Sequence, residues 1–109
     1  LETPAFMSAP IYYSHRVLEA LRDARFAGKL PGIEPDAKTQ LSVRYEDAIP
    51  VGVDCVILST QHGANLSQKD VRRLVEPVVR EALPSGWMTD KTQFYVNPTG
   101  AFVIGGPVG

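Results

Sequence analysis

The segment PDAKTQ, residues 35–40, places an acidic and a basic side chain two positions apart. Because side chains of an extended chain alternate between two faces, Asp36, Lys38 and Gln40 point to one side of such a segment. A lysine so placed can set a positive charge against phosphate oxygens, and an aspartate can accept hydrogen bonds from ribose hydroxyls or a substrate ammonium. A solvated polar strand face with a weak Asp–Lys ion pair has the same pattern, and the spacing alone favours that second interpretation.

A second candidate group lies in GAFVIGGPVG, residues 100–109. Phe102 could stack on a purine base, although an aromatic residue on a strand is more often part of the core. The glycines could let the main chain approach a ligand, but the segment is neither a P-loop nor a GxGxxG fingerprint. By pattern alone it predicts a turn.

The two histidines offer less. Neither His15 nor His62 has a second ligand at metal-binding spacing, and no metal site is predicted. Ser59 and Thr60 precede His62 without the G-x-S-x-G pattern of a hydrolase nucleophile. The sequence therefore carries no independent hydrolase or metal signature.

Composition bounds the class of protein. The 109 residues are 44% apolar and 21% charged with a net charge of -1, which is typical of one globular domain over residues 1–109. No overall positive field favours nucleic acid or an anionic membrane, and no apolar stretch is long enough to span a bilayer. The lone Cys55, expected to pack as a small hydrophobic residue, fits a reducing, cytoplasmic setting. The chain lacks an initiator methionine and begins as though cut from something longer.

The first half of the chain predicts a helix and a hairpin. Ser8 is a candidate N-cap, Pro10 suits the first turn and Gly28 a helix end, with apolar residues at helical spacing between them. The alternating KTQLSVRY and the apolar VGVDCVILST then predict two antiparallel strands joined by EDAIP. We expect Val53, Cys55 and Ile57 on one face of the second strand, which is apolar on both faces and hence central in the sheet.

The second half repeats this layout. Ser67 and Asp70 predict a capping box, with apolar residues following at positions 71, 74, 75, 78 and 82, and Pro77 is expected to kink this helix. QFYV, the turn NPTG and AFVIGG predict two further strands. The order helix, strand, strand, helix, strand, strand favours an α+β two-layer sandwich, with the helices on one face of a largely antiparallel sheet.

Several segments, taken in order, resemble the central domain of S-adenosylmethionine synthetases, also called methionine adenosyltransferases. They are APIYYSHRVL, PDAKTQLSVRYED, STQH, NPTG and FVIGGPVG. The resemblance covers essentially the whole chain and implies a subunit of three similar α+β domains. It also implies the transferase reaction of ATP with methionine, Mg²⁺ and K⁺ as cofactors with ligands outside this segment, and a cytoplasmic homodimer or homotetramer.

The resemblance also assigns roles to residues. It places Asp36, Ala37 and Lys38 at the ATP and methionine site, with Lys38 stabilising charge on the polyphosphate leaving group, and Phe102 beside the nucleoside. Ala101 is a departure, because the family usually has a basic residue there, and Glu34 replaces another common basic residue. The alternative is a non-catalytic α+β module that retains only nucleotide binding or subunit association.

Overall fold

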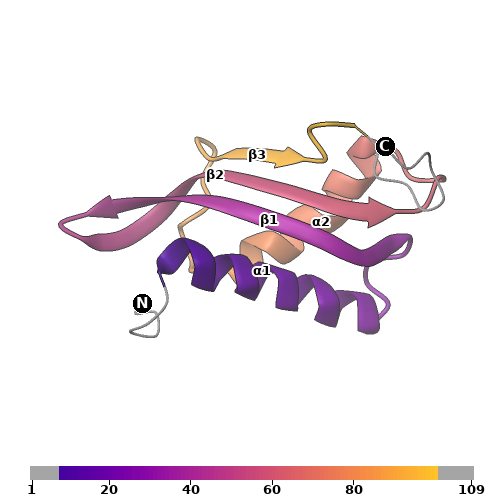
Figure 1. Cartoon of the computed structure of the whole chain (residues 1–109), viewed down its shortest axis with the longest axis horizontal. Helices are drawn as coiled ribbons and strands as arrows, with labels where there is room; N and C mark the ends of the chain where they lie inside the picture. The colour runs from indigo at the N-terminus through magenta and orange to yellow at the C-terminus, as the bar shows by residue number, and fades with distance from the viewer. Residues whose placement is uncertain (1–7, 101–109) are drawn as a thin grey trace.

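The described part of the chain folds into two layers. The computed structural model describes residues 8–100. Its elements, in chain order, are α1 (Ala9–Phe26), β1 (Ile33–Glu46), β2 (Ile49–His62), α2 (Gln68–Ala82) and β3 (Gln93–Val96). The sheet has the order β1-β2-β3, and both helices lie on one of its faces (Figure 1). The predicted α+β two-layer sandwich is confirmed; the strand expected over 101–106 lies outside the described residues.

The ends of α1 follow the predicted signals. Ser8 has the extended backbone of an N-cap, although its side chain makes no capping hydrogen bond, and Pro10 lies in the first turn. At the other end Gly28 takes the left-handed φ of +76°, and its N–H donates to the Arg25 carbonyl over 3.0 Å. The apolar stripe between these ends packs on the sheet, so that α1 covers the inner side of β1.

Helix α2 has a complete capping box. The Ser67 hydroxyl accepts from the Asp70 N–H, and the Asp70 carboxylate accepts from the Ser67 N–H, both over 3.1 Å. Val71, Val75 and Val79 are fully buried. Pro77 lies inside the helix on its exposed side, and α2 continues through it.

Strands β1 and β2 form a long antiparallel hairpin, as predicted. Only Asp47 and Ala48 separate the strands, with φ of 52° and 65°. Two central residues with positive φ are the mark of a type I′ turn, whose twist matches that of paired strands. The hairpin end projects beyond the helices (Figure 1).

The expected face assignment of β2 is wrong at its first residues. Ser42 pairs with Cys55 and Val43 with Val53, so Asp54 is an extra residue opposite β1. Such a bulge shifts the alternation of side chains by one position. Val53 therefore lies in the core with Val56 and Leu58, while Cys55 and Ile57 face outward and are half-buried.

Strand β3 joins the sheet parallel to β2, with Cys55 opposite Gln93 and Leu58 opposite Val96. The sheet is therefore mixed, and β2 is central among the described strands, as predicted. Helix α2 supplies the crossover connection that two parallel strands require.

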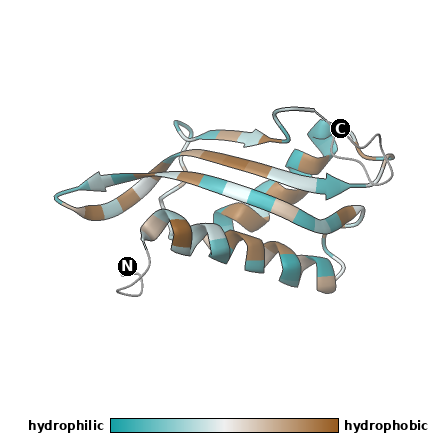
Figure 2. Ribbon diagram, viewed as in Figure 1, coloured by the Kyte–Doolittle hydropathy of each residue, from teal (hydrophilic) through white to brown (hydrophobic). Residues whose placement is uncertain are grey.

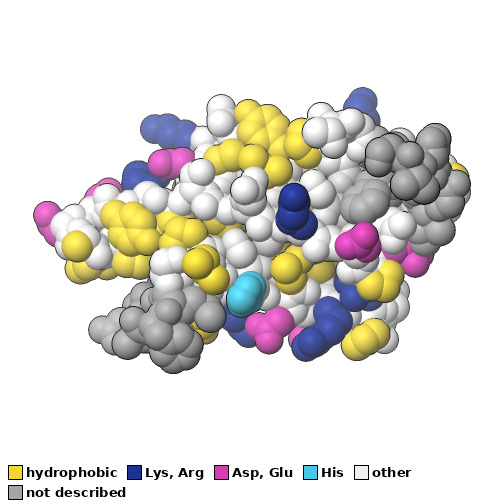
Figure 3. Space-filling view, viewed as in Figure 1, with side chains coloured by type: hydrophobic (Ala, Val, Ile, Leu, Met, Phe, Trp, Pro, Cys, Tyr) yellow, Lys and Arg dark blue, Asp and Glu magenta, His cyan; other side chains and the backbone are white. Residues whose placement is uncertain are grey.

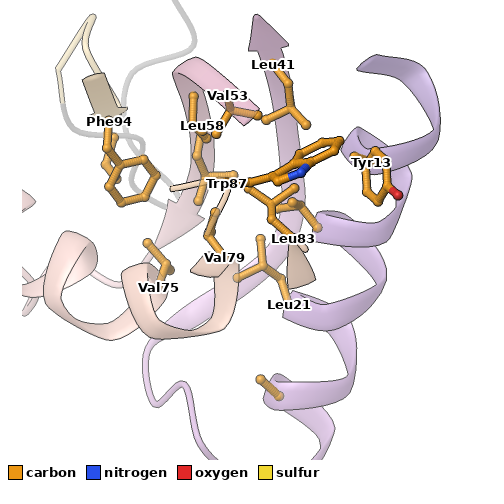
Figure 4. Close-up of a cluster of buried hydrophobic side chains, with 14 of the residues drawn as sticks. Tyr13, Leu21, Leu41, Val53, Leu58, Val75, Val79, Leu83, Trp87 and Phe94 are labelled. Atoms are coloured by element: carbon orange, nitrogen blue, oxygen red, sulfur yellow. The ribbon is translucent and has the colours of Figure 1, made fainter. Parts of the chain in front are cut away.

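The core fills the space between the layers. Brown, hydrophobic bands run along the middle of β2, and brown and teal bands alternate along both helices (Figure 2). Trp87 from the loop after α2 lies at the centre of the buried cluster, between the sheet residues and Tyr13 of α1 (Figure 4). This packed core supports the polar residues at the C-terminal ends of β2 and β3.

Candidate functional site

Strand β1 is irregular where it carries the PDAKTQ segment. Ile33 pairs with His62 and Ala37 with Thr60, so three residues of β1 face a single residue of β2 between these pairs. Pro35 lies in this irregular stretch, on an edge strand of the described sheet, where a residue without an N–H is tolerated. Bulges of this kind redirect side chains. Here the irregularity leaves Asp36 exposed at the sheet edge.

Regular pairing resumes at Ala37, and the next residue, Lys38, lies opposite Ser59 of β2. Both residues border a cavity of about 440 Å³, and Asp36 and Ala37 border it too. The remaining wall comes from the turn after β3, through Asn97, Thr99 and Gly100. The cavity is thus built from three segments that are distant in the sequence.

Asn97 fixes the position of that turn. Its N–H donates to the Leu58 carbonyl over 2.8 Å. Its side-chain oxygen accepts from the Thr60 N–H over 2.8 Å, and its side-chain nitrogen donates to the Thr60 carbonyl over 3.2 Å. Asn97 is 2% exposed and has a φ of 48°, a backbone region that asparagine tolerates better than most residues.

Lys38 and Asp36 carry charges with no opposite charge paired to them within residues 8–100. Neither enters an ion pair among the described residues, so the weak Asp–Lys pair expected of a plain polar face is not formed there. In the space-filling view, basic, acidic and uncharged side chains are interspersed on this face, and one basic side chain near its middle stands apart from the other basic ones (Figure 3). A cation without a partner at a cavity can attract an anionic ligand.

A second hollow of about 530 Å³ runs between α1 and β1. Ser14 and His15 of α1 border it, together with Ala37, Lys38 and Gln40. Lys38 therefore lies between two hollows, and its flexible side chain can reach into either. His62, by contrast, is buried, and its Nδ1 lies 2.9 Å from the Gly63 carbonyl oxygen.

The described residues offer no evident metal cage. Within residues 8–100 no group of three or more His, Cys, Asp and Glu side chains is arranged to hold an ion. Asp36 is the single carboxylate among the described residues that border the 440 Å³ cavity, and the Asn97 amide is engaged with Thr60. Neither of the two helices within residues 8–100 is long and apolar enough to span a membrane.

Asp36, Ala37 and Lys38 border the same cavity, and their assignment to the ATP and methionine site stays a prediction. Ala101 and Phe102 lie outside the described residues, directly after Gly100 of the cavity wall. Sequence reasoning did not place Ser59 and Asn97 at this cavity, which both of them border. The segment NPTG predicted only a turn. An asparagine directly after a buried strand often forms hydrogen bonds from its side chain to the main chain, and this pattern could have pointed to Asn97.

Comparison with known proteins identifies the family. The sequence model described as "S-adenosylmethionine synthetase, central domain" matches residues 1–102. The chain belongs to the S-adenosylmethionine synthetase family. Among curated relatives, the S-adenosylmethionine synthase of Maricaulis maris is 54% identical over 108 residues, and that of Roseobacter denitrificans is 57% identical over 109 residues.

The match covers nearly all of this chain and a fraction of each relative. It takes in 99% of the chain and 28% of these two relatives, so the chain spans little more than a quarter of their length. A solved structure described as an unusual S-adenosylmethionine synthetase from Campylobacter jejuni agrees with the fold at a TM-score of 0.78. Its sequence is 23% identical to this chain, which covers 28% of its length. The likeness therefore supports the fold alone.

Proposed function

We propose that this chain supplies one wall of the active site of an enzyme that makes S-adenosylmethionine from ATP and methionine. Membership of the S-adenosylmethionine synthetase family supports this reaction. The observation that carries the proposal is the cavity on which Asp36 and Lys38 meet the turn after β3. A site of this kind combines a cation for phosphate groups with polar groups for a nucleoside or an amino acid.

The reaction needs stabilisation of a large anion. The methionine sulfur attacks C5′ of ATP and forms a sulfonium, while the C5′–O bond breaks and the electron pair leaves with the triphosphate. Hydrolysis then splits the triphosphate into pyrophosphate and phosphate. A fixed cation directed at the leaving oxygen favours its departure, because negative charge develops there in the transition state. We assign this role to Lys38.

The neighbouring residues position the substrates. Asp36 is exposed beside the cavity and can accept hydrogen bonds from ribose hydroxyls or from the methionine ammonium group. Ala37 borders the same cavity. Phe102 is assigned to stacking on the nucleoside, and Ala101 to the adjacent wall, where it lacks the basic side chain usual in the family.

Mg²⁺ and K⁺ are proposed as cofactors whose ligands come from outside the residues described here. When bound, they would neutralise phosphate charge, and none of the roles given to Asp36 or Lys38 depends on coordinating them. We further propose a homodimer or homotetramer in the cytoplasm, with no nucleic acid or membrane partner. The balanced composition, with a net charge of -1, supports the last point.

A second candidate function is non-catalytic. The chain corresponds to 28% of its relatives, and a module of this size could retain nucleotide binding or subunit association alone. An ATP titration of the 109-residue chain, together with its size in solution, separates these cases. Self-association without ATP binding would indicate a scaffold.

The proposed reaction is tested in a full-length setting. The chain replaces the matching segment of the Maricaulis maris subunit, and S-adenosylmethionine is measured by mass spectrometry after incubation with ATP, methionine, Mg²⁺ and K⁺. Lys38→Ala in this chimera should lower kcat by about 10²- to 10³-fold. Lys91→Ala, which removes an exposed lysine from the loop before β3, is the matched control. An inactive chimera, or a kcat that Lys38→Ala leaves unchanged, would contradict the proposal.

A further inference from the structure

The turn that completes the cavity is attached to the sheet by the side chain of Asn97, whose amide forms the kind of hydrogen bonds with β2 that the main chain of a paired strand would form. Strand β3 ends at Val96, where regular pairing with β2 stops at Leu58. Asn97 continues the contact, because its N–H bonds to Leu58 and its side-chain amide makes two bonds to Thr60. Asn97 thus extends the hydrogen bonding along β2 from Leu58 to Thr60, although the chain after Val96 turns away from the sheet.

The same turn is held from the helix layer. The side-chain nitrogen of Gln68 donates to the Val96 carbonyl over 2.7 Å and to the Asn97 carbonyl over 3.0 Å. The Asn97 carbonyl also accepts from the Gly100 N–H over 2.9 Å, which closes the turn. Gln68 is the first residue of α2, and the capping box beside it fixes where that helix begins. Bonds from two layers therefore converge on one residue.

Asparagine suits this place for two separate reasons. Its backbone tolerates the left-handed φ of 48°, and its short amide carries both the acceptor and the donor that Thr60 needs. An aspartate would lack the donor, and a glycine would keep the backbone but lose both side-chain bonds. The two demands can therefore be separated by substitution.

We propose that Asn97 is a positioning residue, whose side chain holds the 97–100 turn against β2 so that Thr99 and Gly100 keep their place on the cavity of Lys38. This inference rests on the proposed function. Asn97 acts through the turn and not by its own chemistry, because its amide is engaged with Thr60. Errors of about 1 Å in the placement of catalytic groups can cost roughly 10²-fold in rate.

Two variants test the proposal in the Maricaulis maris chimera. Asn97→Gly keeps the left-handed backbone and removes the bonds to Thr60. Gln68→Met removes the two bonds from α2 with little change in side-chain length, and serves as the second variant if Asn97→Gly does not fold. The matched control is Thr92→Ala, since the Thr92 hydroxyl donates to the Val53 carbonyl over 2.8 Å and tethers the opposite end of β3 to β2.

We expect Asn97→Gly to lower kcat on the order of 10- to 100-fold, and Gln68→Met to lower it in the same direction. In a Lys38→Ala background the same Asn97→Gly change should cost less than about threefold, because residues that act as one unit are not additive. Thr92→Ala should change kcat by less than about threefold in both backgrounds, despite a comparable loss of thermal stability.

The outcomes separate the two hypotheses. One outcome is that, in an active chimera, Asn97→Gly and Gln68→Met change kcat as little as Thr92→Ala does. That result would overturn the positioning role of Asn97 and leave the proposed function intact. Equal losses from Asn97→Gly with and without Lys38 would also overturn it, because a merely structural residue behaves in that way. A parent chimera without activity would overturn the proposed function, and the positioning role with it.

Discussion

The rings of Tyr13 and Trp87 meet edge to face, with their centroids 4.8 Å apart and their planes at 61°. Tyr13 comes from α1 and Trp87 from the loop after α2, so the contact joins the first helix to the connection that precedes β3. The Trp87 carbonyl also accepts the Val53 N–H over 3.2 Å, at the bulge of β2. Trp87 therefore links the helix layer to the sheet.

Replacement of Trp87 should be among the most damaging changes to stability. We expect Trp87→Ala to lower the free energy of unfolding by about 3–5 kcal/mol, because a large buried side chain leaves a cavity. Urea unfolding followed by circular dichroism measures this loss. Phe26→Ala removes an aromatic that is 81% exposed and should stay within about 0.5 kcal/mol of the parent. A loss below about 1 kcal/mol for Trp87→Ala would contradict the central place of Trp87 in the core.

Tyr13 should make the chain sensitive to alkaline pH. Burial raises the pKa of the Tyr13 phenol above 10.0, and the neighbouring Tyr12 adds to the increase while Arg16 opposes it. Because the folded pKa is the higher one, the stabilisation is complete below pH 10 and is lost as the pH rises through the folded value. Tyr13→Phe should flatten the decline of stability above pH 10, measured by urea unfolding between pH 8 and 11. Tyr45→Phe is the exposed control, and an unchanged slope in Tyr13→Phe would refute the prediction.

The hairpin turn offers a stabilising substitution. Ala48 has a φ of 65°, in a region that costs an L-residue with a side chain roughly 1–2 kcal/mol and costs glycine much less. We therefore expect Ala48→Gly to raise the free energy of unfolding by about 0.5–1 kcal/mol, after the greater flexibility of glycine in the unfolded chain is subtracted. Ala64→Gly, at an exposed position without positive φ, should lower it instead. Thermal unfolding of both variants decides between the two signs.

The helices and the hairpin were predictable because their signals are local. A capping box, a glycine at a helix end and an alternating strand each depend on residues within a few positions of one another. The faces of β2 were not predictable in the same way. Asp54 is an extra, unpaired residue at a bulge, and it shifts the alternation of side chains so that Val53 faces the core. Nothing in the sequence VGVDCVILST indicates this bulge. The parallel direction of β3 likewise follows from the path of α2 across the layer, which is a tertiary property.

The candidate site was predictable only in part, for a related reason. Asp36 and Lys38 follow from strand alternation and from the family resemblance. Ser59 enters the cavity because the hairpin register places it opposite Lys38, and Asn97 because β3 lies beside β2. Both depend on pairing between distant segments, which one sequence does not reveal. The substrate contacts assigned to Asp36, Lys38, Ala101 and Phe102 all stay predictions.

The start of α2 should lose stability in acid. The Ser67 main chain and then its hydroxyl, with a smaller contribution from Arg73, lower the pKa of Asp70 below 3.8. A lowered folded pKa stabilises the fold above the ordinary carboxyl value and ceases to do so as the pH falls through the folded value. Asp70→Asn should therefore be less stable than the parent at pH 6, and the difference should shrink below about pH 4. Urea unfolding from pH 2 to 6 tests this, with Asp90→Asn as the exposed control; a difference that stays constant down to pH 2 would exclude the charge as its cause.

Introducing a basic residue after the turn should strengthen nucleotide binding. Ala101 follows Gly100, which borders the cavity, and the proposed function would place a basic side chain at this position close to the phosphates of ATP. A charge-assisted hydrogen bond to a phosphate contributes roughly 1.5–3 kcal/mol, which corresponds to at least about tenfold in affinity. In the Maricaulis maris chimera, Ala101→Arg should lower the KM for ATP about tenfold if the contact forms in the ground state.

The neutral Ala101→Gln separates charge from side-chain length, and ionic strength separates charge from packing. A gain caused by charge should be absent in Ala101→Gln and should weaken as salt rises, because counter-ions screen an exposed cation within about 10 Å at 0.1 M. If the new contact forms only in the transition state, kcat will rise while KM for ATP stays constant. Equal kinetics for the Arg and Gln variants would mean that position 101 does not approach the phosphates, and would remove Ala101 from the proposed site.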